Sequence, residues 1–132
     1  MPKNRCFACG KDNPEGLHLH FHYNSIGRSV ECSVKISAKY QGATGFAHGG
    51  IIATLLDEAM AKVNGMGGVR AVTVKLNITY RKMVPVWRKL QLHGRRTKRS
   101  GRKLYLRSEL RDPDGIVLAE ATGLFLTVLP AS

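Results

Sequence analysis

One segment of the 132-residue chain has the hydrophobic period of a helix, and segments with the period of a strand flank it on both sides. Between residues 51 and 63 the apolar side chains recur every three or four positions and cover half of a helical cylinder. The helix is predicted to end near Gly65. Because a single helix can cover one face of a sheet, the pattern predicts an α+β fold with the helix laid across a curved sheet.

Apolar and polar residues alternate in the predicted strands, as they do where one face of a strand is buried. The predicted strands are residues 17–23, 30–36, 72–80, 87–96, 103–110 and 116–129. In the third of these, Thr73 should lie on the polar face, opposite Leu76 and Tyr80. The order β-β-α-β-β-β-β predicts an antiparallel sheet of about six strands. No repeat or linker interrupts it, so residues 1-132 should form a single domain.

The positive charge of the chain is concentrated in one region. Lys and Arg number 21 and Asp and Glu number 9, which gives a net charge of +12. Residues 81–111 contain twelve basic residues and one acidic residue, and so carry +11 of that total. The densest part, residues 95–103, is predicted to be the tip of a hairpin. This excess favours a polyanionic partner, which is a nucleic acid, a membrane face or a small ligand with phosphate groups.

Composition and cysteine content indicate the cellular compartment. No apolar run approaches the roughly 18 residues of a membrane span, and the first ten residues lack the apolar stretch of a signal peptide. The three cysteines, Cys6, Cys9 and Cys32, are too few for a disulfide framework. We therefore expect a cytoplasmic protein without a membrane partner.

Two of the cysteines have the spacing of zinc ligands. Cys6 and Cys9 are separated by two residues, and His18 or His20 could complete a zinc site. A second Cys-x-x-Cys pair is missing. The favoured interpretation is therefore an ordered turn, and we expect no metal and no separate cofactor.

The start of the predicted helix has the features of an oxyanion-binding site. His48, Gly49 and Gly50 precede it, and glycines at a helix start leave backbone N–H groups that a ligand can reach. The helix dipole favours negative charge at the same place. Asp57 lies just off the apolar face of the helix, between small side chains, where a carboxylate could serve as base or nucleophile. An ordinary surface acid is the alternative interpretation of Asp57.

The spacing of these residues has a consequence for assembly. Gly49 and Asp57 are eight residues apart, or about 12 Å along a helix. One chain therefore cannot place both residues on a single carbonyl group. The geometry predicts a site shared across a dimer, with Gly49 from one subunit and Asp57 from the other.

Three segments that span nearly the whole chain resemble a known family. They are residues 48–60 (HGGIIATLLDEAM), 72–82 (VTVKLNITYRK) and 6–19 (CFACGKDNPEGLHL). In order and spacing they resemble the hotdog-fold acyl-CoA thioesterases of the phenylacetate-pathway type. The resemblance implies one long helix wrapped by an antiparallel sheet. It also implies homodimers joined edge to edge through their sheets, often paired into tetramers.

The resemblance implies roles for individual residues. Asp57 would activate water or attack the thioester, and Thr73 would orient the water. The N–H of Gly49 would polarise the thioester carbonyl, supported by His48. Gln41 is the nearest residue to the Asn or Gln that many relatives carry before the His. The phosphates and thioester of CoA, which is part of the substrate, would meet residues near the cleft: Gly50, Arg81, Lys82, Arg95, Arg96 and Arg102.

Other classes of function stay open at this point. The basic region suits a nucleic-acid-binding protein, although no helix-turn-helix, RNP-type strand or zinc-finger spacing is visible. A hotdog domain that binds acyl-CoA without catalysis, or a hotdog dehydratase, would have the same fold. The spacing from His48 to Asp57 resembles the thioesterases more closely than the dehydratases.

Overall fold

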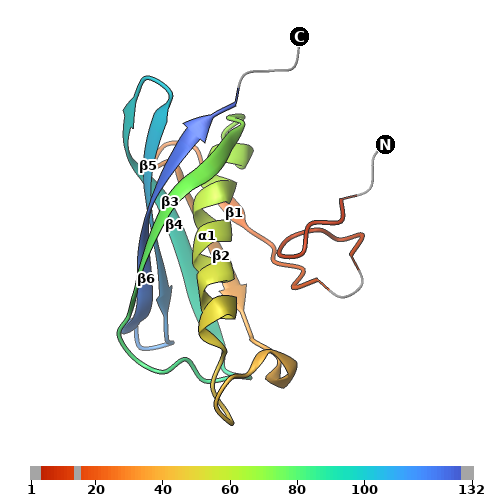
Figure 1. Cartoon of the computed structure of the whole chain (residues 1–132). Coiled ribbons are helices and arrows are strands. Elements are labelled where there is room, and N and C mark those ends of the chain that lie inside the picture. The colour runs from red at the N-terminus through yellow and green to blue at the C-terminus, as the bar shows by residue number, and fades with distance from the viewer. Residues whose placement is uncertain (1–3, 14–15, 129–132) are drawn as a thin grey trace.

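The computed structural model describes residues 4–13 and 16–128, and its central feature is a six-stranded antiparallel sheet. The strands in spatial order are β1 (His22–Asn24), β2 (Ser29–Val34), β4 (Leu90–Ser100), β5 (Lys103–Arg111), β6 (Val117–Thr127) and β3 (Ala71–Tyr80). Helix α1 (Gly49–Met66) lies along one face of this curved sheet, and a short 3₁₀ helix (Ala38–Tyr40) precedes it (Figure 1). The predicted fold class and element order are confirmed.

The helix and the sheet share one apolar core. Leu55, Leu56 and Met60 on α1 are fully buried and pack in one cluster with Leu92 on β4 and Phe125 on β6. Burial of such side chains stabilises the fold by about 1.5–3 kcal/mol each. The buried face of α1 is therefore the one predicted from the spacing of its apolar residues.

Gly94 on β4 is the point of closest approach between helix and sheet. A Cβ atom at this position would lie 2.7 Å from the backbone oxygen of Ala59. Only a glycine lets the two backbones come this close, so Gly94 fixes the depth at which α1 sits on the sheet.

The first predicted strand is mostly wrong. Of residues 17–23 only the last two belong to β1, because His18 has a positive φ of 53° that interrupts the extended backbone. The N–H groups of Leu17 and Leu19 instead donate to the carbonyls of Phe7 and Ala8, at 2.8 and 3.0 Å. The segment therefore pairs with the N-terminal loop, although its alternation of buried and exposed residues is as predicted.

The limits of other strands also differ from the prediction, and the strand predicted at residues 30–36 ends at Val34. The strand predicted at residues 87–96 begins at Leu90, because Trp87 has a positive φ of 62°, and it runs on to Ser100. The last strand ends at Thr127, and its predicted end at residue 129 lies outside the described residues.

A β-bulge in β3 corrects the predicted face of Thr73. Thr73 pairs with Phe125 and Lys75 pairs with Leu124, so Val74 has no partner of its own. Beyond this extra residue the alternation continues with the opposite parity. Thr73 therefore faces the helix, on the same side of the sheet as Leu76 and Tyr80, whereas the unbroken pattern placed it on the other side.

Candidate active site

His48 shapes the start of α1. Its ring Nδ1 accepts a hydrogen bond from the N–H of Gly50 at 2.9 Å, which makes His48 the N-cap of the helix. The N–H of Gly50 is therefore engaged, which counts against its predicted contact with substrate. The N–H of Gly49 has no acceptor in the part of the chain that the structure describes. A donor at a helix start with no internal partner is suited to bind an oxyanion.

Gln41 stabilises the loop that leads into the helix. Its side-chain oxygen accepts the N–H of Gly45 at 3.0 Å, and its backbone forms an antiparallel bridge with Ala47. The N–H of His48, which follows Ala47, donates to the carbonyl of Tyr40 at 2.9 Å and so fixes the backbone at His48. The structure thus gives Gln41 a contact in the loop, and its role at the reaction centre stays a prediction.

Tyr80 connects the end of β3 with the start of α1. Its hydroxyl donates to the carbonyl of Gly49 at 2.8 Å. A cavity of about 380 Å³ opens beside this contact. Its lining combines apolar side chains with two cations: Phe46, Ala47, Gly49, Ile52, Tyr80, Arg81, Lys82, Met83 and Val84. Gly49, Arg81 and Lys82 therefore line one cavity, and the contact of the two cations with phosphates stays a prediction.

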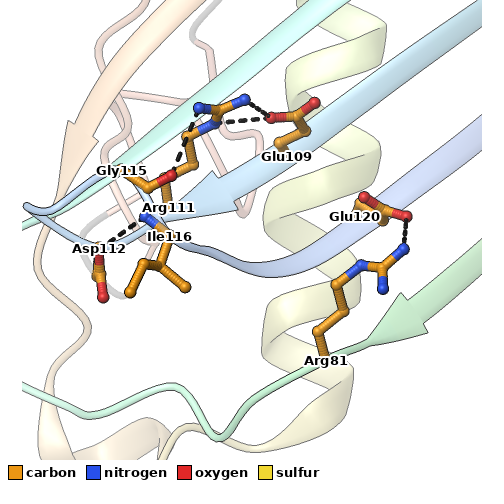
Figure 2. A network of polar contacts seen from close by, with 7 residues as sticks. All are labelled: Arg81, Glu109, Arg111, Asp112, Gly115, Ile116 and Glu120. Carbon is orange, nitrogen blue, oxygen red and sulfur yellow. Dashed lines mark hydrogen bonds and ion pairs between the residues drawn. The ribbon is translucent and has the colours of Figure 1, made fainter.

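Arg81 already has an acidic partner, as Figure 2 shows. Its guanidinium forms an ion pair with Glu120 on β6, with 2.6 Å between Nη2 and Oε1. The hydrogen bond from Arg81 lowers the pKa of Glu120, and the same bond raises the pKa of Arg81. Lys82 forms no ion pair with any residue in the described ranges. Lys82 is thus the less engaged of the two cations at this cavity.

Asp57 and Thr73 meet farther along the helix. The hydroxyl of Thr73 donates to a carboxylate oxygen of Asp57 at 2.9 Å, and Asp57 is half-buried. Thr73 reaches Asp57 because the bulge turns it toward α1. Asp57 and Gly49 lie on the same helix, so the separation of about 12 Å predicted from the sequence applies. One chain does not bring these two residues together.

Comparison with known proteins identifies the family. The family model "Thioesterase superfamily" matches residues 44–119, which include α1, β3, β4 and β5 and the start of β6. The chain belongs to the thioesterase superfamily. It is 31% identical over 131 residues to the mouse protein named acyl-coenzyme A thioesterase THEM4, a match that covers 98% of this chain and 56% of the relative. The mouse acyl-coenzyme A thioesterase THEM5 is 34% identical over 111 residues, or 83% of this chain and 44% of the relative. The chain thus spans about half the length of the curated relatives it matches.

Solved structures agree with this assignment. A thioesterase superfamily protein superposes with a TM-score of 0.87 at 31% identity, over 93% of this chain and 63% of the other. A Streptococcus mutans UA159 protein bound to acetyl CoA has a TM-score of 0.77 at 23% identity, over 86% and 91% of the two chains. A phenylacetic acid degradation-related protein from Ralstonia eutropha JMP134 has a TM-score of 0.75 at 21% identity, over 85% and 86%. These likenesses confirm the hotdog fold of this thioesterase-superfamily chain.

The basic hairpin tip lies away from the Gly49 cavity of the same subunit. The β4–β5 hairpin ends beside the C-terminal end of α1, at the opposite end of the molecule from Gly49 (Figure 1). Arg102 is held there by a hydrogen bond to the carbonyl of Thr127 at 2.8 Å. Burial, with the like charges of Arg28 and Arg99, lowers the pKa of Arg96. Arg95 points into a groove on the outer face of the sheet. Within one subunit, the predicted phosphate contacts at the tip are therefore not brought to the cavity.

Sequence reasoning missed two features of this side of the molecule. Tyr80 was placed on the apolar face of a strand, and nothing in its spacing indicated a bond to Gly49. The second feature is a cluster of Cys6, Cys9 and Glu58, the ligand atoms of which lie within 4.8 Å of one another. His18 and His20 do not join it, and His18 instead contacts the carbonyl of Asn13. The Cys-x-x-Cys spacing signalled the pair of thiols, but no sequence pattern named Glu58.

No helix in the described part of the chain is long and apolar enough to cross a membrane. The cytoplasmic location stays a prediction.

Proposed function

We propose that this chain is an acyl-CoA thioesterase of the phenylacetate-pathway type, with active sites shared between two subunits of a homodimer. The unengaged N–H of Gly49 beside an apolar cavity carries the proposal. The names of the THEM4 and THEM5 relatives and the acetyl CoA bound by a protein of the same fold support it.

The edge strand β3 offers the surface for the dimer. It is the last strand of the sheet, so one side of its backbone is unpaired. Val72 and Val74 on it are 53% and 54% exposed, which is high for valine. A two-fold axis near the middle of β3 would pair two copies of this strand antiparallel and join the two sheets into one.

This pairing would complete the active site. In each subunit the Tyr80 end of β3 holds Gly49, and the Thr73 end holds Asp57. Antiparallel pairing reverses one strand relative to the other. The Tyr80 end of one subunit would then lie beside the Thr73 end of its partner. Gly49 of one subunit and Asp57 of the partner subunit would therefore face the same carbonyl group.

The chemistry follows from these two groups. As the thioester carbonyl is attacked, its oxygen gains negative charge, and the N–H of Gly49 would stabilise that oxyanion at the positive end of the helix dipole. The partner's Asp57 would either accept a proton from the attacking water or attack the carbonyl itself. The hydroxyl of Thr73 holds the Asp57 carboxylate in a fixed orientation in either route. The reaction needs no cofactor beyond the CoA of the substrate.

The same dimer would give the hairpin tip a role. The two-fold axis places the partner's β4–β5 tip at the end of the molecule where Gly49 lies. Within each subunit, β6 lies between β5 and the edge strand β3. The β4–β5 tip of one subunit would therefore lie three strand spacings, or about 14 Å, from β3 of the other subunit. Arg95, Arg96 and Arg102 of the partner would then be candidates for the outer phosphates of CoA, with Arg81 and Lys82 closer to the cavity.

Asp57→Asn tests the catalytic role. Asparagine keeps an oxygen for the Thr73 hydrogen bond but cannot act as base or nucleophile, so we expect thiol release from acyl- and aryl-CoA substrates to fall by about 10²–10⁴-fold. The matched control is Asp114→Asn, an exposed turn residue, which should leave the rate unchanged. Equal rates for wild type and Asp57→Asn would refute the proposal. Binding of acyl-CoA without hydrolysis by the wild type would favour the non-catalytic hotdog domain.

Mixed dimers test the shared site. Asp57→Asn and a variant without the Gly49 N–H should each be inactive, but a dimer containing one of each has one intact site. Random exchange makes half of the dimers mixed, each with one of two sites working, so activity should return to about a quarter of the wild-type value. Absence of recovery, with exchange confirmed by mass spectrometry, would contradict a site built from two subunits.

A further inference from the structure

The N-terminal segment is held against α1 at the residue next to Asp57. Cys6, Cys9 and Glu58 bring their ligand atoms within 4.8 Å of one another, and all three side chains are half-buried. The two thiols come from a loop and the carboxylate comes from the middle of the helix. We propose that Cys6, Cys9 and Glu58 form a zinc-binding site that fastens the N-terminal segment to α1.

The loop around the two cysteines is rigidly built. The N–H of Gly10 donates to the carbonyl of Cys6 at 2.9 Å, and Asn4 accepts the N–H of Cys6 through its side-chain oxygen at 3.2 Å. A Cβ atom on Gly10 would lie 2.3 Å from the nitrogen of Cys6, so this tight turn requires glycine there. The turn is thus formed before any ion binds, which lowers the entropic cost of assembling the ligands.

The residues between the cysteines anchor the turn to the rest of the chain. The carbonyls of Phe7 and Ala8 accept the N–H groups of Leu17 and Leu19, and Ala8 is buried. These contacts orient the loop so that both thiols point toward Glu58 on α1. This pairing is also what replaced the strand predicted at residues 17–23.

Lys62 completes the charge balance of the site. It lies one helical turn after Glu58 and interacts electrostatically with Cys9 and Glu58. Two thiolates and one carboxylate carry three negative charges, which the two positive charges of Zn²⁺ and the single charge of Lys62 would neutralise.

The donor set and its spacing suit zinc. Two sulfurs and a carboxylate oxygen are ligands that Zn²⁺ takes in tetrahedral sites. With Zn–S bonds of about 2.3 Å, the two sulfurs of such a site are about 3.8 Å apart. Ligand atoms that already lie within 4.8 Å of one another need move by only a fraction of that distance. A water molecule would take the fourth position.

Cobalt titration of the reduced full-length chain tests the site. After removal of metal with a chelator, one Co²⁺ per chain should bind with the visible absorption of a tetrahedral site and a sulfur-to-cobalt charge-transfer band. One equivalent of Zn²⁺ should then abolish both signals. Co²⁺ uptake without the charge-transfer band, or no uptake at all, would overturn the proposal.

Matched variants assign the ligands. Cys6→Ser should weaken Zn²⁺ binding by at least about 100-fold and Glu58→Gln by about 10–100-fold. Cys32→Ser, which removes a buried thiol from β2, and Asp57→Asn, which removes the neighbouring carboxylate, should bind as the wild type does. Unchanged affinity in Cys6→Ser would overturn the assignment. Because Asp57→Asn lacks the proposed activity but keeps the metal, failure of one proposal is distinguishable from failure of the other.

Hydrogen exchange gives a readout that does not depend on the spectrum. Zn²⁺ should slow the exchange of backbone amides in residues 4–13 of the wild type by roughly tenfold or more. The same addition should leave those amides unchanged in Glu58→Gln. Equal protection in both proteins would show that Glu58 does not join the loop to the helix through the ion.

Discussion

The helix-facing side of the sheet and its outer face differ sharply in charge. Residues 41–60, which contain Gly49 and Asp57, have no Lys or Arg. On the outer face a groove of about 600 Å³ is lined by Lys75, Arg95 and Arg107, together with neutral side chains. The sheet therefore separates the cations of this groove from Gly49 and Asp57, whereas Arg81 and Lys82 line the Gly49 cavity itself.

This separation bears on assembly as well as on substrate. Two outer faces packed directly on each other would bring the cations of one groove against those of its copy. The dimer of dimers predicted from the family resemblance would therefore need anions between such faces. Pairing through β3 brings fewer cations together, because Lys75 is the one charged residue of that strand and its exposed Val72 and Val74 are neutral.

The largest expected effect on activity comes from a substitution at Gly49, in the segment 41–60 that has no Lys or Arg. Gly49→Pro removes the proposed oxyanion donor at the first helical position, where proline is tolerated, and the extended backbone of His48 suits a following proline. We expect kcat for thioester hydrolysis to fall by about 10²–10³-fold with the helix content unchanged by circular dichroism.

Gly49→Ala is the matched control for the donor. Its Cβ atom would lie 3.6 Å from the hydroxyl of Tyr80, an ordinary contact, and the N–H is kept. The rate should therefore stay within a few-fold of wild type. If proline and alanine reduce the rate equally, the space at Gly49 matters and its N–H does not.

The next largest effect is expected at Gly94, where β4 and α1 come into contact. A Cβ there would lie 2.7 Å from the backbone oxygen of Ala59, so Gly94→Ala must displace α1 from β4. We expect the free energy of unfolding to fall by about 1–3 kcal/mol, measured by urea denaturation under reducing conditions. Gly27→Ala, in an exposed turn, should change it by less than about 0.5 kcal/mol. A Gly94→Ala protein as stable as wild type would show that the helix can move away from the sheet without cost.

A smaller effect should distinguish two parts of the basic region. Lys82 lines the Gly49 cavity and has no ion-pair partner in the described residues, whereas Arg102 is bonded to Thr127 at the hairpin tip. Loss of one exposed phosphate contact costs about 1 kcal/mol, so Lys82→Ala should raise KM for acyl-CoA about fivefold. Arg102→Ala should raise it by about twofold or less. A larger effect of Arg102 would place the phosphates at the tip.

Most of the helices and strands were predictable from the sequence, because the spacing of apolar residues changes from every three or four positions in α1 to every second position in the strands. The helix follows from apolar residues at helical spacing, and its buried face is the predicted one. The parity of β3 was not predictable, because residues 72–80 alternate without a break and the bulge at Val74 depends on pairing with β6. The approach of Cys6 and Cys9 to Glu58 was also hidden, because it joins a loop to a helix about fifty residues away.

Sequence reasoning named the candidate site residues, whose catalytic roles stay predictions, but it did not give all of their contacts. The spacing of Gly49 and Asp57 on one helix correctly separated the two groups along α1. The hydrogen bonds of Thr73 and Tyr80 to this helix depend on where an edge strand lies, which sequence periods alone do not give. Clustering Arg102 with Arg81 by charge alone grouped residues from opposite ends of one subunit, because Arg102 is bonded to Thr127 beside the start of β3 and Arg81 follows its end. Arg95 and Arg96 lie between them, level with Asn77 and Leu76 in the sheet.

The smallest expected effect is on stability and concerns the ion pair between Arg81, in the basic region, and Glu120 on β6. The hydrogen bond from Arg81 lowers the pKa of Glu120 in the folded chain. The pair therefore contributes stability above the unfolded pKa of a Glu, about 4.3, and that contribution is lost as pH falls through the lower folded value. Glu120→Gln should be slightly less stable than wild type near pH 7 in urea denaturation. The difference should shrink as pH falls below about 4.3 and disappear once Glu120 is protonated in the folded chain as well. Because both side chains are partly exposed, 150 mM salt should also shrink it. A difference that does not shrink as the pH falls would mean that Glu120 acts through packing and not through its charge.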